Sequence, residues 1–255
     1  MTDLHQLTVA ALPDIPLVKP GDDITTIILR GLDRAKITLA DDDIIVIASK
    51  IVSKAEGRIA KLSDVTPSEE AVKVAEKTRK DARVVQLVLD ESVSISRMAP
   101  GVLVTQHRLG FVSANAGIDQ SNVSEDRDDI LLLPENPDET AHQIVADLYA
   151  HSGARVAVVI SDSHGRPFRM GNIGVAIGLA GMPGLLDLRG QPDLFGRELK
   201  ISLLGFGDLV ASAAHLLSGE GNEGRPVVLL RGLSLERTDG NAGELNRPAQ
   251  QDLYR

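Results

Sequence analysis

Two short apolar runs, at residues 43–48 and 155–161, constrain the fold of this chain most strongly. Both are rich in isoleucine and valine, a composition typical of strands inside a protein core. A polar segment follows each run directly, with Ser49 and Lys50 after the first and Asp162 and Ser163 after the second. We therefore expect functional side chains at the points where two buried strands leave the core.

Other stretches predict a mixture of strands and helices around these runs. Turn residues at 108–110 join two β-prone runs and predict a hairpin, whose second strand would deliver Asp119 to the rim of a sheet. Asp22 or Asp23, Thr66 and Asp138 are predicted to cap three of the helices. We expect further strands at residues 7–12, 102–107, 111–116, 198–204 and 226–230, and helices at 22–32, 66–77, 84–89, 138–151 and 208–217.

The composition predicts one domain with an aliphatic core. The chain has 255 residues, of which 43% are hydrophobic but only 2% are aromatic, and it has no tryptophan. We assign residues 1–235 to a single domain and residues 236–255 to a polar C-terminal tail. Glycines recur between residues 171 and 181, which lets backbone elements approach closely and favours a role in packing over one in ligand binding.

Charge and cysteine content exclude several classes of function. The formal net charge of −9 disfavours binding to nucleic acids and to anionic membranes, so an anionic substrate would need a local cationic pocket. Without cysteine, a metal must be bound through oxygen or imidazole ligands. The N-terminus lacks the pattern of a signal peptide, and no apolar stretch is long enough to span a membrane, so we expect a cytoplasmic protein.

Two segments are candidates for phosphate binding. Residues 49–58 bring hydroxyls together with Lys50, Lys54 and Arg58, which can form charge-assisted hydrogen bonds, although a solvated amphipathic segment explains the pattern equally well. The loop at residues 218–225 contains three glycines, whose backbone N–H groups can approach phosphate oxygens, and Glu220 could bind a bridging cation. A flexible connection between a helix and a strand is the alternative for this loop.

Together, residues 15–19, 49–58, 115–123, 161–166 and 218–225 resemble segments of the coenzyme F420-0:L-glutamate ligase family. The resemblance extends from about residue 7 to 232. It implies an α/β (α+β) fold, with a mixed sheet and two interlocked subdomains, that works as a homodimer. The implied activity is GTP-dependent addition of L-glutamate to coenzyme F420-0, and then of further γ-linked glutamates, in coenzyme F420 biosynthesis. The implied cofactors are two divalent ions, Mn²⁺ or Mg²⁺, with K⁺ as a stimulant.

The resemblance also implies site residues. Asp119 and Asp162 match the family's metal carboxylates, Ser163 and Glu220 match positions for a second cation, and Asp119, Asp162 and Lys54 are the catalytic candidates. The positions that match GTP-binding segments are Ile15, Pro16, Leu17, Val18, Ser49, Lys50, Lys54, Asn122, Ser218, Gly219, Glu220, Gly221, Asn222, Glu223, Gly224 and Arg225.

These residue types suit the implied chemistry. A carboxylate is a poor electrophile, so amide formation is most simply driven by phosphoryl transfer from GTP, which gives an acyl phosphate. Divalent ions held by oxygen ligands would offset the phosphate charge, and Lys54, Arg58 and Arg166 are candidate anion clamps. A related amide ligase acting on another anionic acceptor, and a non-catalytic nucleotide-binding protein, are the alternatives.

Overall fold

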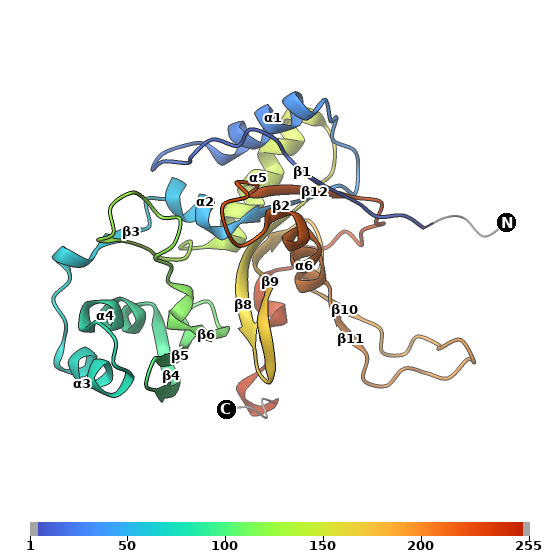
Figure 1. The fold of residues 1–255 in the computed structure, drawn as a ribbon. Helices are drawn as coiled ribbons and strands as arrows, with labels where there is room; N and C mark the ends of the chain where they lie inside the picture. The colour runs from blue at the N-terminus through green and yellow to red at the C-terminus, as the bar shows by residue number, and fades with distance from the viewer. Residues whose placement is uncertain (1–4, 252–255) are drawn as a thin grey trace.

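A five-stranded mixed sheet forms the centre of the molecule in the computed structural model, which describes residues 5–251 (Figure 1). β2 (Ile44–Ala48) and β8 (Ala157–Arg166) run parallel, and the other neighbouring strands are antiparallel. This sheet, together with the helices that cover it, confirms the α/β class. The strand order across the sheet is β1 (Thr8–Ala11), β12 (Val227–Arg231), β2 (Ile44–Ala48), β8 (Ala157–Arg166) and β9 (Arg169–Ala180).

Helices cover both faces of the central sheet, which explains why its inner strands are apolar without interruption. Side chains alternate between the two faces of a strand. Ile45 and Ile47 of β2 pack in the cluster that contains Ile28 of α1, whereas Ile44 and Val46 pack in a second cluster with residues of α6. The first face is covered by α1 (Ile24–Ala35), α2 (Ser49–Ala55) and α5 (Pro137–Ser152), and the second by α6 (Phe206–Ser218).

A smaller lobe is inserted between β2 and β8, at the lower left of Figure 1. Its core packs two helices against a three-stranded antiparallel sheet, and a short two-stranded sheet leads into and out of it. The predicted hairpin at residues 102–116 is confirmed in this lobe. The lobe elements are α3 (Glu69–Thr78), α4 (Ala82–Asp90), β4 (Ser92–Ala99), β5 (Val102–His107) and β6 (Val112–Ala114); β3 (Ile59–Lys61) and β7 (Asp129–Leu131) form the short sheet. The interlocking of two subdomains stays a prediction.

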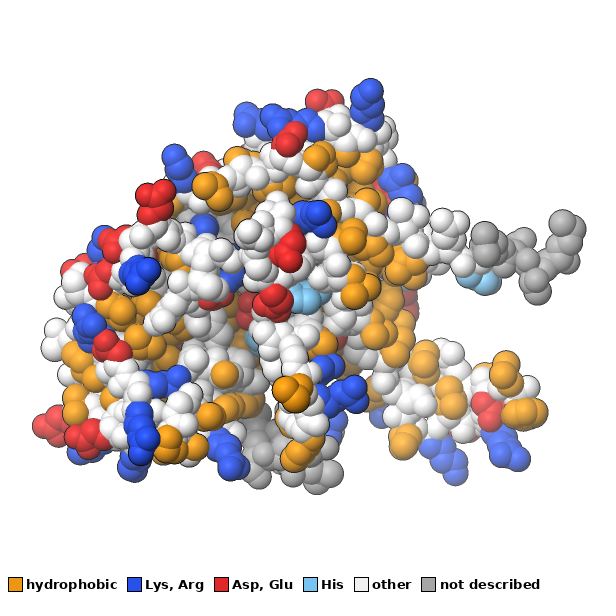
Figure 2. Space-filling model, viewed as in Figure 1, with side chains coloured by type: hydrophobic (Ala, Val, Ile, Leu, Met, Phe, Trp, Pro, Cys, Tyr) orange, Lys and Arg blue, Asp and Glu red, His pale blue; other side chains and the backbone are white. Residues whose placement is uncertain are grey.

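An extended arm projects from the body between β10 (Leu185–Asp187) and β11 (Leu203–Gly205), at the lower right of Figure 1. The strand predicted at residues 198–204 is wrong over most of its length, because regular pairing begins only at Leu203. Figure 2 shows hydrophobic side chains along this arm. Leu194, Phe195 and Ile201 are 99%, 86% and 88% exposed, so the apolar pattern marks an uncovered surface and not a core strand.

Three further expectations differ in detail. Ser68, and not Thr66, caps α3, with its hydroxyl accepting a hydrogen bond from Ala71 N. Asp138 lies inside the first turn of α5 and accepts hydrogen bonds from Leu179 N and Ala242 N, so it joins the helix to β9 and to the C-terminal segment. β8 does not end at Asp162, because β9 pairs with it as far as Arg166. Asp162 instead lies where β8 leaves the core.

A buried carboxylate connects the lobe to the body. The side chain of Glu91 is 10% exposed, and its oxygens lie 2.7 Å from Arg58 Nη2, 3.1 Å from Arg108 Nε and 3.4 Å from His107 Nε2. Burial raises the pKa of Glu91, but the hydrogen bonds from its basic neighbours outweigh burial and lower this pKa to about 2. Arg58, a predicted anion clamp, donates its hydrogen bonds to Glu91 and to Leu133 O. It does not line either cavity described below.

The glycines of β9 lie where the backbone passes close to helices. A Cβ atom at Gly178 would stand 2.5 Å from the carbonyl carbon of Pro137 in α5. We expect Gly178→Ala to lower the free energy of unfolding by about 1–3 kcal/mol, because backbone has to move to admit the methyl group. Gly165→Ala is the matched control in the same hairpin, since its Cβ would meet only Asn172 Oδ1 at 3.7 Å. Urea denaturation of both variants tests this, and equal losses would contradict the packing role.

Within residues 5–251, no helix is both long and apolar enough to cross a lipid bilayer.

Candidate active site

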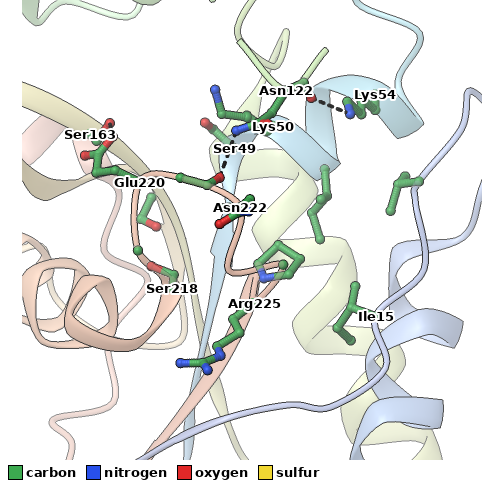
Figure 3. Close-up of a pocket in the computed structure, with 18 of the residues that line it drawn as sticks. Ile15, Ser49, Lys50, Lys54, Asn122, Ser163, Ser218, Glu220, Asn222 and Arg225 are labelled. Carbon is green, nitrogen blue, oxygen red and sulfur yellow. Dashed lines mark hydrogen bonds between the residues drawn. The ribbon is translucent and has the colours of Figure 1, made fainter. Parts of the chain in front are cut away.

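The first cavity has a volume of about 370 Å³ and lies beside the end of β2 (Figure 3). Five segments of the chain meet there: the proline-containing loop after β1, the first turns of α2, the turn at Asn122, residues 161–163 of β8, and the glycine loop between α6 and β12. Fifteen of the predicted nucleotide positions line it: Ile15, Pro16, Leu17, Val18, Ser49, Lys50, Lys54, Asn122, Ser218, Gly219, Glu220, Gly221, Asn222, Gly224 and Arg225. The structure thus brings together segments that lie as much as 200 residues apart, although their binding to GTP stays a prediction.

Glu223 is the predicted nucleotide position that does not line the first cavity. Its carboxylate turns back and accepts a hydrogen bond from Gly221 N at 2.8 Å, which closes the glycine loop on itself. Asn122 connects this loop to the other wall of the cavity, since its Nδ2 donates to Gly221 O and its own carbonyl accepts from Lys54 Nζ at 2.7 Å (Figure 3). The loop therefore takes its shape from contacts with its neighbours.

The second cavity, of about 1170 Å³, lies between the lobe and the β8–β9 hairpin. Arg97 of β4, Arg166 of β8 and Arg169 of β9 line it, together with Asp119. Arg166 Nε is buried and has no hydrogen-bond partner among the described residues, while its Nη2 donates to Met170 O at 3.3 Å. The second cavity shares Asp162, Ser163 and Glu220 with the first. These three residues form a common wall.

The residues of the common wall hold one another in place. Asp162 accepts a hydrogen bond from Ser49 Oγ at 3.0 Å, and its other oxygen lies 3.0 Å from His164 Nε2. Glu220 accepts from Ser163 Oγ at 3.2 Å, and its other oxygen lies 2.9 Å from His215 Nε2. Each carboxylate is therefore paired with one hydroxyl and one imidazole.

His164 and His215 were not among the predicted site residues. A strand places residues i and i+2 on one face, so His164 could have been paired with Asp162 if β8 had been predicted to continue past residue 161. His215 stands in the last turn of α6, one helical turn before the glycine loop, and only the fold of that loop brings Glu220 back to it.

An aromatic ring links the common wall to the buried carboxylate of the lobe. Phe111 stacks on His107, with ring centroids 5.1 Å apart, and also contacts His164 at 4.9 Å. His107 belongs to the Glu91 cluster and His164 to the Asp162 pair. The two clusters are thus joined through a single phenyl ring.

Asp119 reaches the second cavity through an isolated β-bridge with Leu131. One of its oxygens accepts hydrogen bonds from Ser121 N at 2.7 Å and Ser121 Oγ at 2.8 Å, and the other is in contact with Lys50 Nζ. Burial lowers the pKa of Lys50, and the charges of Asp162 and Glu220 oppose that effect. Burial also lowers the pKa of Lys54. Both lysines are therefore partly desolvated cations.

The donors available to a metal ion are the oxygens of Asp119, Asp162, Ser163 and Glu220, all of which line the second cavity. Carboxylate and hydroxyl oxygens are the ligands that Mg²⁺ and Mn²⁺ prefer, so the donor chemistry fits a hard divalent ion. Residues 5–251 contain no group of three or more acidic or histidine side chains already assembled as a ligand set. Instead, the ammonium group of Lys50 stands at Asp119.

Comparison with known proteins identifies the family of this chain. Residues 14–232 match the family model described as F420-0:Gamma-glutamyl ligase. A protein of Methanocaldococcus jannaschii named "Coenzyme F420:L-glutamate ligase" is 42% identical over 242 residues, which cover 95% of this chain and 94% of the relative. Proteins with the same name from Methanopyrus kandleri and Methanothermobacter thermautotrophicus are 42% and 44% identical, over 100% and 98% of this chain and 100% and 99% of the relatives.

Similarity of this extent places the chain among the ligases that form carbon–nitrogen bonds. Within that class, the chain belongs to the F420-0:gamma-glutamyl ligase family. The resemblance found in the sequence is thereby confirmed.

Proposed function

We propose that this protein is a GTP-dependent ligase that joins L-glutamate to coenzyme F420-0, and then adds further γ-linked glutamates, in the biosynthesis of coenzyme F420. The observation that carries the proposal is the pair of cavities that meet at Asp162, Ser163 and Glu220. A ligase of this kind must bring a nucleotide phosphate and an acceptor carboxylate to one point. A common wall with a cavity on each side provides such a point.

The first cavity suits the nucleotide. Lys50, Lys54 and Arg225 line it, so phosphate oxygens would meet cations there in a chain whose net charge is −9. The glycines of the loop at residues 218–225 let backbone N–H groups approach the same oxygens. Selectivity for GTP over ATP is the part of the proposal that rests on the family alone.

The second cavity suits an anionic acceptor. Arg97, Arg166 and Arg169 line it, and guanidinium groups bind carboxylates and phosphodiesters through paired hydrogen bonds. The volume, about 1170 Å³, exceeds that of the first cavity and leaves room for a large substrate. We assign the coenzyme precursor to this cavity, with its reactive carboxylate directed at the common wall.

The reaction then proceeds in two steps. An oxygen of the acceptor carboxylate attacks the γ-phosphorus of GTP, and the bond to the β–γ bridging oxygen breaks, which releases GDP and leaves an acyl phosphate. The glutamate amine attacks the acyl carbon, the bond to the phosphate breaks, and the nitrogen loses a proton to give the amide. Lys50, Lys54 and the arginines would orient the anions, and positioning of the two reactants supplies much of the rate acceleration.

Asp119, Asp162 and Glu220, with Ser163, would hold the divalent ions of this proposal, Mn²⁺ or Mg²⁺. When bound, such an ion neutralises phosphate charge and polarises the phosphorus–oxygen bond. Stimulation by K⁺ stays a prediction. We also expect the reaction to take place in the cytoplasm.

A product assay tests the proposed function. Purified protein is incubated with Mn²⁺, L-glutamate, coenzyme F420-0 and either GTP or ATP, and mass spectrometry follows the acceptor. We expect the acceptor to gain one glutamate residue or more, faster with GTP. A different acceptor that is modified in its place would favour the related amide ligase, and nucleotide binding without any product would favour the non-catalytic protein. Equal or faster turnover with ATP would contradict the choice of donor.

We further propose that the protein is a homodimer, in which the arm at residues 188–202 covers part of a second copy. Leu194, Phe195 and Ile201 are almost fully exposed on this arm, and burial of such side chains favours association. Sedimentation should show a dimer for the wild type and a monomer for a variant with these three residues changed to serine. Leu216→Ser, on the exposed side of α6, is the matched control and should stay dimeric. A monomeric wild type with full activity would overturn the proposal.

A further inference from the structure

Lys50 lies at the boundary between the two cavities. It is the second residue of α2 and lines the first cavity, yet its ammonium group contacts Asp119, which lines the second. The same ammonium group donates a hydrogen bond to Ser121 O at 3.3 Å. The side chains of Lys50 and Asp119 are only 30% and 34% exposed. A partly desolvated cation therefore connects the two sides of the site.

One carboxylate contacts this cation, and the charges of two others act on it. Asp119 is in direct contact with it, and Asp162 and Glu220 are near enough for their charges to act on it. The hydrogen bonds of Asp162 and Glu220 go elsewhere, to hydroxyl and imidazole groups. Lys50 is thus the basic side chain that contacts Asp119, one of the residues whose oxygens are available to a metal ion.

We propose that Lys50 is a tethered cation, which compensates the charge of Asp119 in the metal-free protein and has to leave this carboxylate before a divalent ion can bind there. This inference rests on the proposed function for the metal and the nucleotide. Two cations at contact distance from one carboxylate repel each other strongly, even near a protein surface. The first cavity would offer the side chain another position, because Lys50 also lines that cavity and nucleotide phosphates would attract its charge there.

Mn²⁺ alone provides the test, because free and bound Mn²⁺ are distinguished by electron paramagnetic resonance without any turnover. Lys50→Met keeps most of the side-chain volume and removes the charge. We expect it to bind Mn²⁺ at least about tenfold more tightly than the wild type, since a competing cation is removed from the ligands. Lys50→Arg keeps the charge and should bind Mn²⁺ about as weakly as the wild type.

Lys54→Met is the matched control for the general loss of a positive charge. Lys54 stands one helical turn further along α2, lines the same cavity and donates to Asn122 O in place of a carboxylate. We expect its affinity for Mn²⁺ to change by less than about threefold, because the charge it removes is not in contact with a metal ligand. Circular dichroism of each variant verifies that the fold is retained.

A second measurement uses a non-hydrolysable GTP analogue. In the wild type, the analogue should tighten Mn²⁺ binding by two routes, direct coordination and attraction of Lys50 away from Asp119. In Lys50→Met only the first route remains, so the analogue should tighten Mn²⁺ binding less than in the wild type. Direct coordination contributes to both proteins and cancels in the comparison.

Several outcomes would overturn the proposal. Unchanged or weaker binding of Mn²⁺ by Lys50→Met would show that the ammonium does not compete with the metal. Equal tightening in Lys50→Met and Lys54→Met would show a general effect of charge. Absence of Mn²⁺ binding in every variant would also reject it. If the wild type still ligates glutamate in the presence of Mn²⁺, any of these results rejects the role of Lys50 and leaves the proposed function standing.

Discussion

Replacement of Asp119 or Asp162 with asparagine is expected to lower the rate of glutamate ligation by at least about a hundredfold. Each change removes one formal charge from a group that faces the second cavity, while the shape of the side chain is kept. Loss of a metal ligand weakens charge neutralisation in the transition state, which amounts to several kcal/mol, and each 1.4 kcal/mol corresponds to about a factor of ten in rate. The rate at saturating substrates, measured across a Mn²⁺ titration, is the readout.

The same two variants should remain folded. An asparagine oxygen can still accept from Ser121 N at position 119 and from Ser49 Oγ at position 162, so we expect losses of stability of about 1 kcal/mol. Melting temperatures without metal separate this structural contribution from the catalytic one. Asp126→Asn is the control, since Asp126 is exposed, pairs with Lys61 and lines neither cavity. Ligation at near wild-type rates by both site variants at low Mn²⁺ would disprove the proposal that Asp119 and Asp162 hold a divalent ion.

Replacement of Glu91 with glutamine is expected to have the largest effect on stability. The carboxylate is buried among Arg58, His107 and Arg108, and its removal leaves two guanidinium groups without a counter-ion among residues 5–251. Breaking a buried ion pair by removing one partner costs about 3–5 kcal/mol. Urea denaturation at pH 7 measures the loss. Glu56→Gln is the control, because Glu56 is exposed and its oxygens accept from Glu135 N and Thr140 Oγ1.

Glu91 also makes stability dependent on pH in the acid range. Its pKa falls from 4.5 in the unfolded chain to about 2 in the folded protein, so folding favours the ionised form. The resulting stabilisation, about 3 kcal/mol, is complete above pH 4.5 and is lost as the pH falls towards 2. Glu91→Gln lacks this titration. The difference in the free energy of unfolding between the wild type and Glu91→Gln should therefore become smaller between pH 5 and pH 3. A difference that stays constant would show that the ion cluster does not cause the pH dependence of stability.

The sequence predicted the elements whose signal is local. Ile44 to Ala48 and the run that begins at Ala157 form the inner strands, because a continuous aliphatic run can be buried only inside a layered fold. Asp23 caps α1 as predicted, since an N-cap depends on residues within one turn. The segments expected to bind a nucleotide and a metal converge on two adjoining cavities. Residue types placed at strand ends indicated part of the site, and the resemblance to the ligase family supplied the remaining positions.

The wrong or missed features depend on partners that are distant in the sequence. The sequence predicts Arg58 as an anion clamp, but this side chain is bound by Glu91 of the lobe. The sequence predicts Asp138 as a helix cap, but its carboxylate joins β9 to the C-terminal segment. The sequence predicts a strand at residues 198–204, because exposed and buried leucines cannot be distinguished in a sequence. In each case the sequence shows correctly whether the residues are polar or apolar. It does not show which distant residues they contact, because the tertiary fold determines those contacts.

Position 111 is suited to a fluorescent probe of the contact between the lobe and the central sheet. The ring of Phe111 stands between His107, which belongs to the lobe, and His164, which belongs to the hairpin that carries Asp162, so a rotation of the lobe away from the sheet has to separate this stack. The chain contains no tryptophan. An indole introduced at position 111 would be the only one in the chain, and the emission of an indole depends on the groups that contact it. Any movement that separates these rings would then be measured as a change in the intensity of the indole emission.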